Sequence, residues 1–170
     1  PTTLETCAGN TITLNSNVTS FTDPVYQWKR NGVAINTGGN DANYTATQDG
    51  DYTVQVTERN NSSRTATSCG VSVMIHPLPI VNAGTDFTIT CTTNAGGLVI
   101  GETPETGFDY VWSSPNGVSG LSNSTIANPR ANPTVTTTYT IRKTNLLTLC
   151  WKEDSITITV DTTLPVANAG

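Results

Sequence analysis

Gly50-Asp51-Tyr52-Thr53-Val54-Gln55-Val56-Thr57 is the stretch that decides the fold, because its apolar and polar side chains alternate. An extended chain places Tyr52, Val54 and Val56 on one face and the residues between them on the other. The same period of two recurs in further rows, which are Val71/Val73/Ile75, Phe87/Ile89/Cys91, Val135/Thr137/Tyr139/Ile141 and Ile156/Ile158/Val160. No window shows the apolar stripe of a helix, so the sequence predicts an all-β protein.

Turn-forming residues separate these rows. Glycine and asparagine tolerate the positive φ values that tight turns between strands require. Such residues occur at Asn31-Gly32, Gly38-Gly39-Asn40, Asp49-Gly50, Gly96-Gly97 and Pro115-Asn116-Gly117. Short strands separated by tight turns predict β-sandwiches rather than βαβ units.

The chain repeats itself. Three pairs of residues recur 84 positions apart, which are Cys7/Cys91, Tyr26/Tyr110 and Trp28/Trp112. The string Pro79-Ile80-Val81-Asn82-Ala83-Gly84 returns as Pro165-Val166-Ala167-Asn168-Ala169-Gly170, so we expect the chain to be part of a longer array. The predicted modules are residues 1–76 and 77–162, followed by the start of a further repeat over 163–170. A semi-rigid linker, Ile75-His76-Pro77-Leu78-Pro79, is predicted between the modules.

The four cysteines are expected to form disulfides, because none lies in the close pairs typical of zinc or redox sites. Four cysteines allow three pairings. We favour Cys7–Cys69 with Cys91–Cys150, because each bridge then serves one repeat. Each would close a loop of about 60 residues, worth roughly 4 kcal/mol in the chain-entropy model. Disulfides imply an oxidising compartment.

Large aromatic residues mark the expected cores. Trp28 and Trp112 would lie on the central third strand of an immunoglobulin-like sandwich, as the largest core side chains. Gly50-Asp51-Tyr52 is similar to a tyrosine corner, and Tyr139 is the counterpart of Tyr52 in the second repeat. The sequence therefore predicts two tandem immunoglobulin-like or PKD-like β-sandwiches.

The second repeat resembles the PKD-like or Ig-like repeats of giant surface adhesins and other type IX-secreted proteins of Bacteroidota. The matching strings are Asn82-Ala83-Gly84-Thr85-Asp86, Tyr110-Val111-Trp112, Asn128-Pro129-Arg130-Ala131-Asn132-Pro133-Thr134, Thr136-Thr137-Thr138-Tyr139-Thr140, and Cys150 followed by Asp154-Ser155-Ile156-Thr157-Ile158-Thr159-Val160. The first repeat resembles the companion Ig-like module through Tyr26-Gln27-Trp28-Lys29-Arg30-Asn31-Gly32 and Gly50-Asp51-Tyr52-Thr53-Val54.

The resemblance implies an extracellular, cell-surface location and a role in adhesion. Among these proteins, the gliding-motility adhesin is the single type that the repeats resemble most. Asp154-Ser155-Ile156 and Asp161-Thr162-Thr163 resemble the family's O-glycosylation signal, which implies modification at Ser155 and Thr162. The sequence departs from animal PKD domains at one motif. The WDFGDGS-like string that follows this Trp in animal PKD domains is replaced by Ser113-Ser114-Pro115-Asn116-Gly117 after Trp112, so properties tied to that string are not expected.

Composition excludes several classes of function. The 170 residues include 8 basic and 13 acidic side chains, for a net charge of −5, so a nucleic-acid partner is not expected. No apolar run approaches the roughly 18 residues of a membrane span, so no membrane insertion is expected. His76 is the only histidine, and it lies in the predicted linker without an assignable nucleophile or orienting carboxylate. The sequence therefore predicts a protein that is not an enzyme and has no catalytic residues.

Acidic residues are interpreted as solvated charge. The pairs Glu102/Glu105 and Glu153/Asp154 have the composition of an acid–base pair, but they lie in polar stretches. Aspartates near the expected module ends leave structural calcium open, although no acidic calcium-binding loop is present. These aspartates are Asp86, Asp109 and Asp161. We expect no cofactor and no metal ligands.

Trp151 directly follows Cys150 and has two interpretations. It either shields a disulfide, which we favour, or offers an exposed platform for a sugar ring. The predicted function is a non-catalytic stalk repeat of a large surface adhesin, whose partners are neighbouring repeats of the same chain and a surface polysaccharide or other extracellular ligand. The alternative is a carbohydrate-binding or spacer module of a secreted polysaccharide-degrading enzyme.

Overall fold

The computed structural model describes residues 2–163 and divides the chain into two compact units. Unit 1 is Pro1–Pro77 and unit 2 is Leu78–Gly170. The described residues form strands, turns and loops without a helix, so the all-β prediction is confirmed. None of them belongs to a helix long and apolar enough to cross a membrane. The expected start of a further repeat over 163–170 lies, apart from Thr163, outside the described residues.

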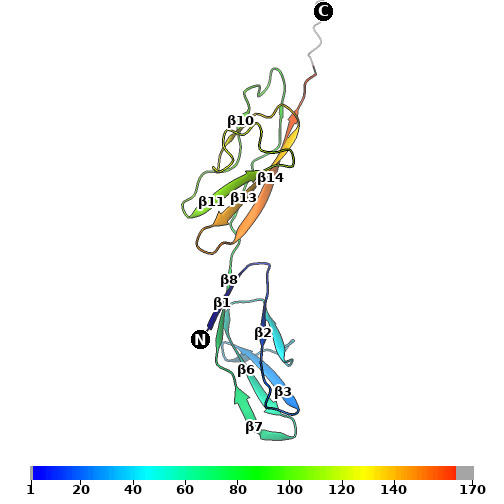
Figure 1. Ribbon diagram of the computed structural model, residues 1–170, viewed down its shortest axis with the longest axis vertical. Helices are drawn as coiled ribbons and strands as arrows, with labels where there is room; N and C mark the ends of the chain where they lie inside the picture. The colour runs from blue at the N-terminus through cyan, green and yellow to red at the C-terminus, as the bar shows by residue number, and fades with distance from the viewer. Residues whose placement is uncertain (1, 164–170) are drawn as a thin grey trace, which may run out of the picture. The chain divides into compact units, whose positions relative to one another are not determined.

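Unit 1 consists of two sheets that share one core (Figure 1). The larger sheet has the order β1-β8-β6-β3-β4, with β7 paired to β6, and the smaller sheet pairs β2 with β5. The strands are β1 (Thr2–Cys7), β2 (Ile12–Asn15), β3 (Pro24–Arg30), β4 (Val33–Ala34), β5 (Asn43–Ala46), β6 (Gly50–Glu58), β7 (Asn61–Thr67) and β8 (Val71–His76).

The core of unit 1 follows from the alternation in β6. Tyr52, Val54 and Val56 are 1%, 1% and 2% exposed and face the smaller sheet's Leu14 within one cluster. Trp28 is buried in the same cluster, and its Nε1–H donates to the carbonyl of Asp41 at 2.9 Å. The Tyr52 hydroxyl donates to the carbonyl of Gln48 at 2.7 Å, four residues upstream, which is the geometry of a tyrosine corner.

A two-residue turn closes the β3–β4 hairpin. Arg30 pairs with Val33, and the turn residues Asn31 and Gly32 have φ values of 50° and 79°. Positive φ at both central residues defines a type I′ turn, whose twist matches that of the flanking strands. The predicted Asn-Gly turn therefore sets this edge of the larger sheet.

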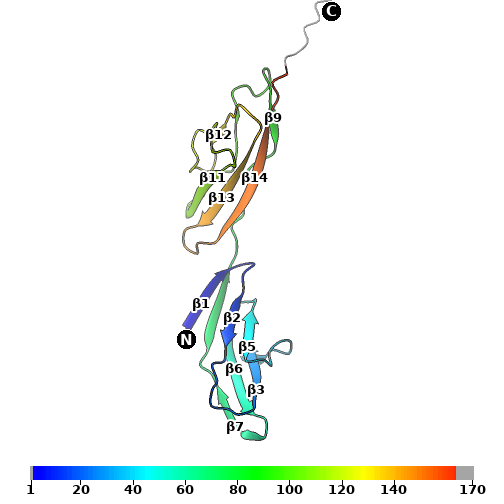
Figure 2. The ribbon, with the colours of Figure 1, turned by 45° about the vertical axis from the view of Figure 1, so that its right-hand side comes forward.

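Unit 2 has a four-stranded sheet with the order β11-β13-β14-β9 and a short pair, β10 with β12 (Figure 2). The strands are β9 (Phe87–Ile89), β10 (Leu98–Val99), β11 (Phe108–Ser113), β12 (Arg130–Ala131), β13 (Thr137–Asn145) and β14 (Trp151–Val160). Trp112 and Tyr139 are 2% and 0% exposed in its core. The indole Nε1–H of Trp112 donates to the carbonyl of Ile126 at 2.9 Å, and the Tyr139 hydroxyl donates to the carbonyl of Ser119.

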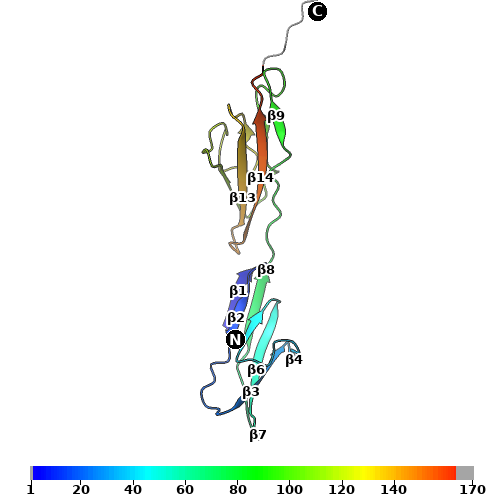
Figure 3. The ribbon, with the colours of Figure 1, turned by 90° about the vertical axis from the view of Figure 1, so that its right-hand side faces the viewer.

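The first and last strands of each unit pair in parallel. In unit 1, β1 runs beside β8 from the pair Thr2↔Val71 to the pair Cys7↔His76. In unit 2, β9 runs beside β14 from Phe87↔Ile158 to Ile89↔Val160 (Figure 3). The end of a unit at which its last strand begins is called here the leading end, and the end at which that strand finishes is the trailing end. In unit 1, β1 and β8 begin together at the leading end. In unit 2, β14 begins at the leading end, and β9 runs beside only its final residues at the trailing end.

This direction makes the predicted disulfides wrong. Cys7 and Cys150 are disulfide-bonded, whereas Cys69 and Cys91 carry free thiols. In unit 1, Cys69 lies two residues before β8, at the leading end, and Cys7 pairs with His76 at the trailing end. At about 3.3 Å per residue the two are roughly 20 Å apart, whereas a disulfide needs Cα atoms within about 7 Å.

Unit 2 repeats this separation. Cys150 directly precedes the first residue of β14, and Cys91 follows Ile89, which pairs with Val160 near the end of β14. The length of β14 places them roughly 30 Å apart at about 3.3 Å per residue. The pairing Cys91–Cys150 is therefore excluded by the strand direction, and the expectation of one disulfide within each repeat does not hold.

Candidate functional site

An exposed aromatic residue stands on the outer face of the four-stranded sheet in unit 2. Trp151 is the first residue of β14 and is 47% exposed. The guanidinium carbon of Arg142, on β13, lies 4.2 Å from the centroid of a Trp151 ring. Arg142 Nε also lies 2.9 Å from Glu153 Oε1, across the Arg142↔Glu153 pair of the ladder. Val111, which pairs with Arg142 on its other side, is 45% exposed.

These four residues, Val111, Arg142, Trp151 and Glu153, form what we call the Trp151 surface. The indole offers a flat apolar face, and the cation stacked on it is held in place by a carboxylate. The sheet supplies a rigid backbone beneath them, because each residue belongs to a paired strand. The surface therefore combines an apolar stacking face with the hydrogen-bond donors of Arg142 and the acceptor oxygens of Glu153.

Lys143 is a buried residue at the edge of the core of unit 2, and the sequence analysis missed it. Lys143 is 2% exposed and lies on the inward face of β13. Its Nζ is 2.6 Å from Glu102 Oε1 and 2.7 Å from Glu105 Oε1. The same ammonium lies 4.6 Å from the centroid of the Phe108 ring and 5.7 Å from that of Tyr110.

The environment of Lys143 favours its charged form. Burial lowers its pKa, but the hydrogen bonds to Glu102 and Glu105 outweigh burial, and the net result is a pKa above the ordinary value. The segment that carries the two glutamates is held further by Glu105, whose backbone N–H donates to the Tyr110 hydroxyl at 3.1 Å. Lys143, Glu102 and Glu105 therefore form a charged cluster, held by hydrogen bonds, at one end of the core of unit 2.

The acidic residues of the two pairs make ion pairs and hydrogen bonds within unit 2. Glu102 and Glu105 converge on Lys143 rather than on a solvent-filled site. The interpretation of Glu102 as solvated charge is wrong, because its side chain is only 14% exposed. Glu153 pairs with Arg142, whereas the neighbouring Asp154 accepts a hydrogen bond from the Ala83 N–H at 2.8 Å.

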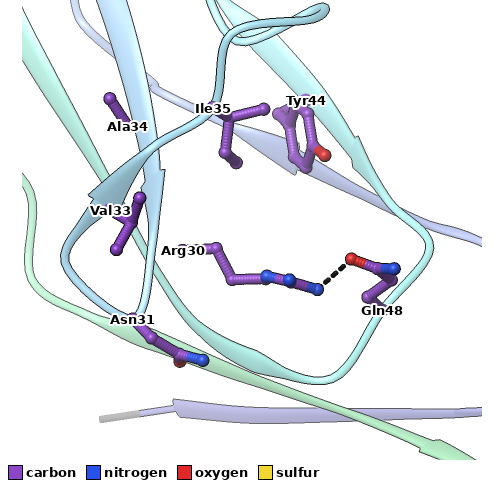
Figure 4. Close-up of a pocket in the computed structure, with 7 residues that line it drawn as sticks. All are labelled: Arg30, Asn31, Val33, Ala34, Ile35, Tyr44 and Gln48. Carbon is purple, nitrogen blue, oxygen red and sulfur yellow. Dashed lines mark hydrogen bonds between the residues drawn. The ribbon is translucent and has the colours of Figure 1, made fainter.

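Unit 1 has a pocket of about 380 Å³ between the β3–β4 hairpin and the segment from β5 to β6 (Figure 4). Arg30 spans it, with its Nη1–H donating to Gln48 Oε1. The residues that line it are Arg30, Asn31, Val33, Ala34, Ile35, Tyr44 and Gln48. Its lining has one cation and no carboxylate, histidine or cysteine, so it lacks the groups of a hydrolytic centre.

The remaining predicted residues are dispersed. His76 belongs to β8 and not to the linker, because it completes the ladder opposite Cys7, and its Nε2 lies 2.9 Å from Glu5 Oε2. Asp86 Oδ1 accepts the Thr157 N–H at 2.8 Å. Within residues 2–163, no group of three or more His, Cys, Asp or Glu side chains is arranged to hold a metal ion.

The two candidate O-glycosylation residues are accessible. Ser155 is exposed on the outer face of β14, where its hydroxyl lies 2.8 Å from that of Thr140. Thr162 is exposed beyond the end of β14. Neither side chain is needed for the core of unit 2.

No protein-family model matches the chain, and no curated protein matches it. Among solved structures it is similar to Sidekick-1 immunoglobulin domains 1-5, with 18% identity, a TM-score of 0.40, and coverage of 95% of this chain and 39% of that one. It is also similar to the amphioxus IgVJ-C2 molecule, with 16% identity, a TM-score of 0.39 and coverage of 92% and 99%. The three N-terminal domains of the bacteriophage RB49 Highly Immunogenic Outer Capsid protein share 18% identity, a TM-score of 0.41 and coverage of 91% and 55%.

The chain spans 39% and 49% of the two Sidekick-1 structures that it matches.

Proposed function

We propose that this chain is a non-catalytic, extracellular structural segment of immunoglobulin-like repeats, belonging to the stalk of a large cell-surface adhesin. Its work in this proposal is mechanical: it transmits tension and keeps a distal binding region away from the cell. The resemblance of its strings to Bacteroidota repeats extends the proposal to type IX secretion, surface attachment and gliding motility.

The observation that supports this most is the parallel pairing of first and last strands. Tension applied through the ends of unit 1 pulls β1 and β8 in opposite directions along their common axis. The ladder of pairs from Thr2↔Val71 to Cys7↔His76 is then loaded in shear, so its hydrogen bonds resist together rather than one after another. In unit 2, the ladder between β9 and β14 is reinforced by Asp86, which accepts from the Thr157 N–H.

The outer faces suit a solvated stalk. Hydroxyl pairs bridge neighbouring strands on these faces, with oxygens 2.9 Å apart in Thr138–Thr157 and 3.2 Å apart in Thr57–Thr65. Such β-branched polar residues fit a pleated surface without exposing a continuous apolar patch to other chains. The disulfide-bonded state of Cys7 and Cys150 agrees with an oxidising, extracellular compartment.

Single-molecule pulling tests the mechanical role, with a thiol reductant present so that disulfides do not carry the load. The Ala8 N–H donates to the His76 carbonyl, and donors alternate along a parallel ladder, so Thr6→Pro removes a β1–β8 hydrogen bond. We expect Thr6→Pro to lower the unfolding force of unit 1 by more than Tyr52→Phe does at equal loss of thermal stability. Tyr52 lies on β6, outside the ladder. Equal losses of force would contradict the proposal.

The Trp151 surface supports a second candidate, a carbohydrate-binding module of a secreted polysaccharide-degrading enzyme. An exposed indole beside paired charges is chemistry that a sugar ring recognises, through stacking and hydrogen bonds. A glycan array distinguishes the two. Binding that is lost in Trp151→Ala and kept in the control Val33→Ala, an exposed residue of unit 1, would favour this candidate.

A further inference from the structure

The four cysteines occupy two equivalent positions in the repeat. Cys69 and Cys150 lie just before the last strands, β8 and β14, at the leading end of each unit. Cys7 and Cys91 lie at or just after the end of the first strands, β1 and β9, at the trailing end. Each unit therefore carries one leading-end sulfur and one trailing-end sulfur, too far apart to bond to each other.

At each of the two positions, one cysteine is disulfide-bonded and the other is free. The disulfide-bonded cysteines are one of the trailing type, Cys7, and one of the leading type, Cys150. Their counterparts in the other repeat, Cys91 and Cys69, are both free and exposed. The same position of the same fold thus holds a disulfide-bonded cysteine in one repeat and a free, exposed thiol in the other. The two free thiols are themselves of complementary types, Cys69 at a leading end and Cys91 at a trailing end.

Both free thiols can be approached from outside. Cys91 lines a hollow of about 400 Å³ with Ile89, Pro133 and Val160 at the trailing end of unit 2. Cys69 lines a hollow of about 240 Å³ with Leu4 and Val71 at the leading end of unit 1. An incoming chain segment can therefore reach either sulfur without unfolding the strand beside it.

We propose that Cys91 and Cys69 are the sites of disulfides between repeats, each bonding to a cysteine of the complementary type in another immunoglobulin-like repeat of this kind. A trailing-end sulfur bonds to a leading-end sulfur, which joins successive units end to end. The inference rests on the proposed stalk function and adds to it a covalent link between units. Each bond forms as two thiols lose two protons and two electrons, which reduce one disulfide of an oxidant such as oxidised glutathione to two thiols.

A second copy of the chain supplies the complementary cysteine in the test. Cys69→Ser and Cys91→Ser chains, tagged to differ in mass, are each purified with the other bond intact, mixed, and incubated with oxidised glutathione. Because each variant keeps one free thiol type, a Cys91–Cys69 bond can form only between different variants. We expect the mixed dimer on a non-reducing gel to exceed either homodimer about tenfold. Peptide mass spectrometry identifies the bond.

The controls distinguish a specific Cys91–Cys69 bond from random oxidation of exposed thiols. The double variant Cys69→Ser/Cys91→Ser stays monomeric, and the thermal unfolding of both single variants matches that of the parent, because the two residues are exposed. A mixed dimer in only the statistical excess of about twofold, or glutathione adducts alone, would overturn the inference. Neither result affects the pulling measurement on the β1–β8 ladder, so the two experiments test the disulfide inference and the stalk function independently.

Discussion

Removing the ammonium of Lys143 is the most informative single perturbation of unit 2. Lys143→Ala leaves the Glu102 carboxylate, 14% exposed, without its counter-ion at 2.6 Å, and it also leaves a cavity beneath Phe108. Breaking a buried ion pair by removing one partner costs about 3–5 kcal/mol. For a unit of this size, that lowers the melting temperature by roughly 12–40 °C, at about 4–8 °C per kcal/mol.

Thermal unfolding followed by circular dichroism measures this, with the transition of unit 1 as an internal reference. Lys152→Ala is the matched control, because Lys152 pairs with Lys143 in the ladder but is exposed. Its expected effect is within about 0.5 kcal/mol. Replacing both Lys143 and Glu102 by leucine should restore most of the stability, because buried pairs are often neutral against apolar residues. A loss below about 1 kcal/mol in Lys143→Ala would refute the reasoning.

The pKa of Lys143 adds a pH dependence with a definite sign. Its folded-state pKa is raised above the unfolded value of about 10.4. The stabilisation is therefore complete below that value and is lost as pH rises through the folded-state pKa. Melting temperatures of unit 2 measured upward from about pH 9 should fall in the parent, and Lys143→Met should remove this component of the fall.

Three further predictions concern the cores and the loop before β3. Glu58 accepts hydrogen bonds from the Thr22 and Asp23 backbone N–H groups, which lower its pKa, so its stabilisation is present above about pH 4.3 and is lost as pH falls through the lower folded-state value. Glu58→Gln should therefore reduce the acid-dependent part of unit 1 unfolding, measured as melting temperature against pH. Tyr52→Phe removes the bond to the Gln48 carbonyl and should lower the stability of unit 1 by about 1 kcal/mol in urea titration. Trp112→Phe should cost unit 2 roughly 2 kcal/mol or more, and an unchanged unit 2 transition would show that this indole is not a core residue.

The sequence by itself determined several of the strands and turns, because their signals are local, although the predicted rows extended beyond β9 to Cys91 and ahead of β13 to Val135. The alternation around Tyr52 and Val54 reports which side chains face inward, and the Asn31-Gly32 pair reports a type I′ turn. The repeat of 84 positions likewise predicted that Trp112 occupies the place of Trp28, and both are buried. The same alternation, extended two residues beyond Ile141, places Lys143 on the inward face.

Only the tertiary structure decided which residues meet across long separations in the chain. The ion cluster joins Lys143 to Glu105, 38 residues away, through a loop whose path has no local signal. The cysteine pairing depended on whether the first and last strands of a unit run in the same direction, and alternation is identical for parallel and antiparallel strands. Because β1 and β8 proved parallel, residues that seemed to be natural partners lie at opposite ends of the unit.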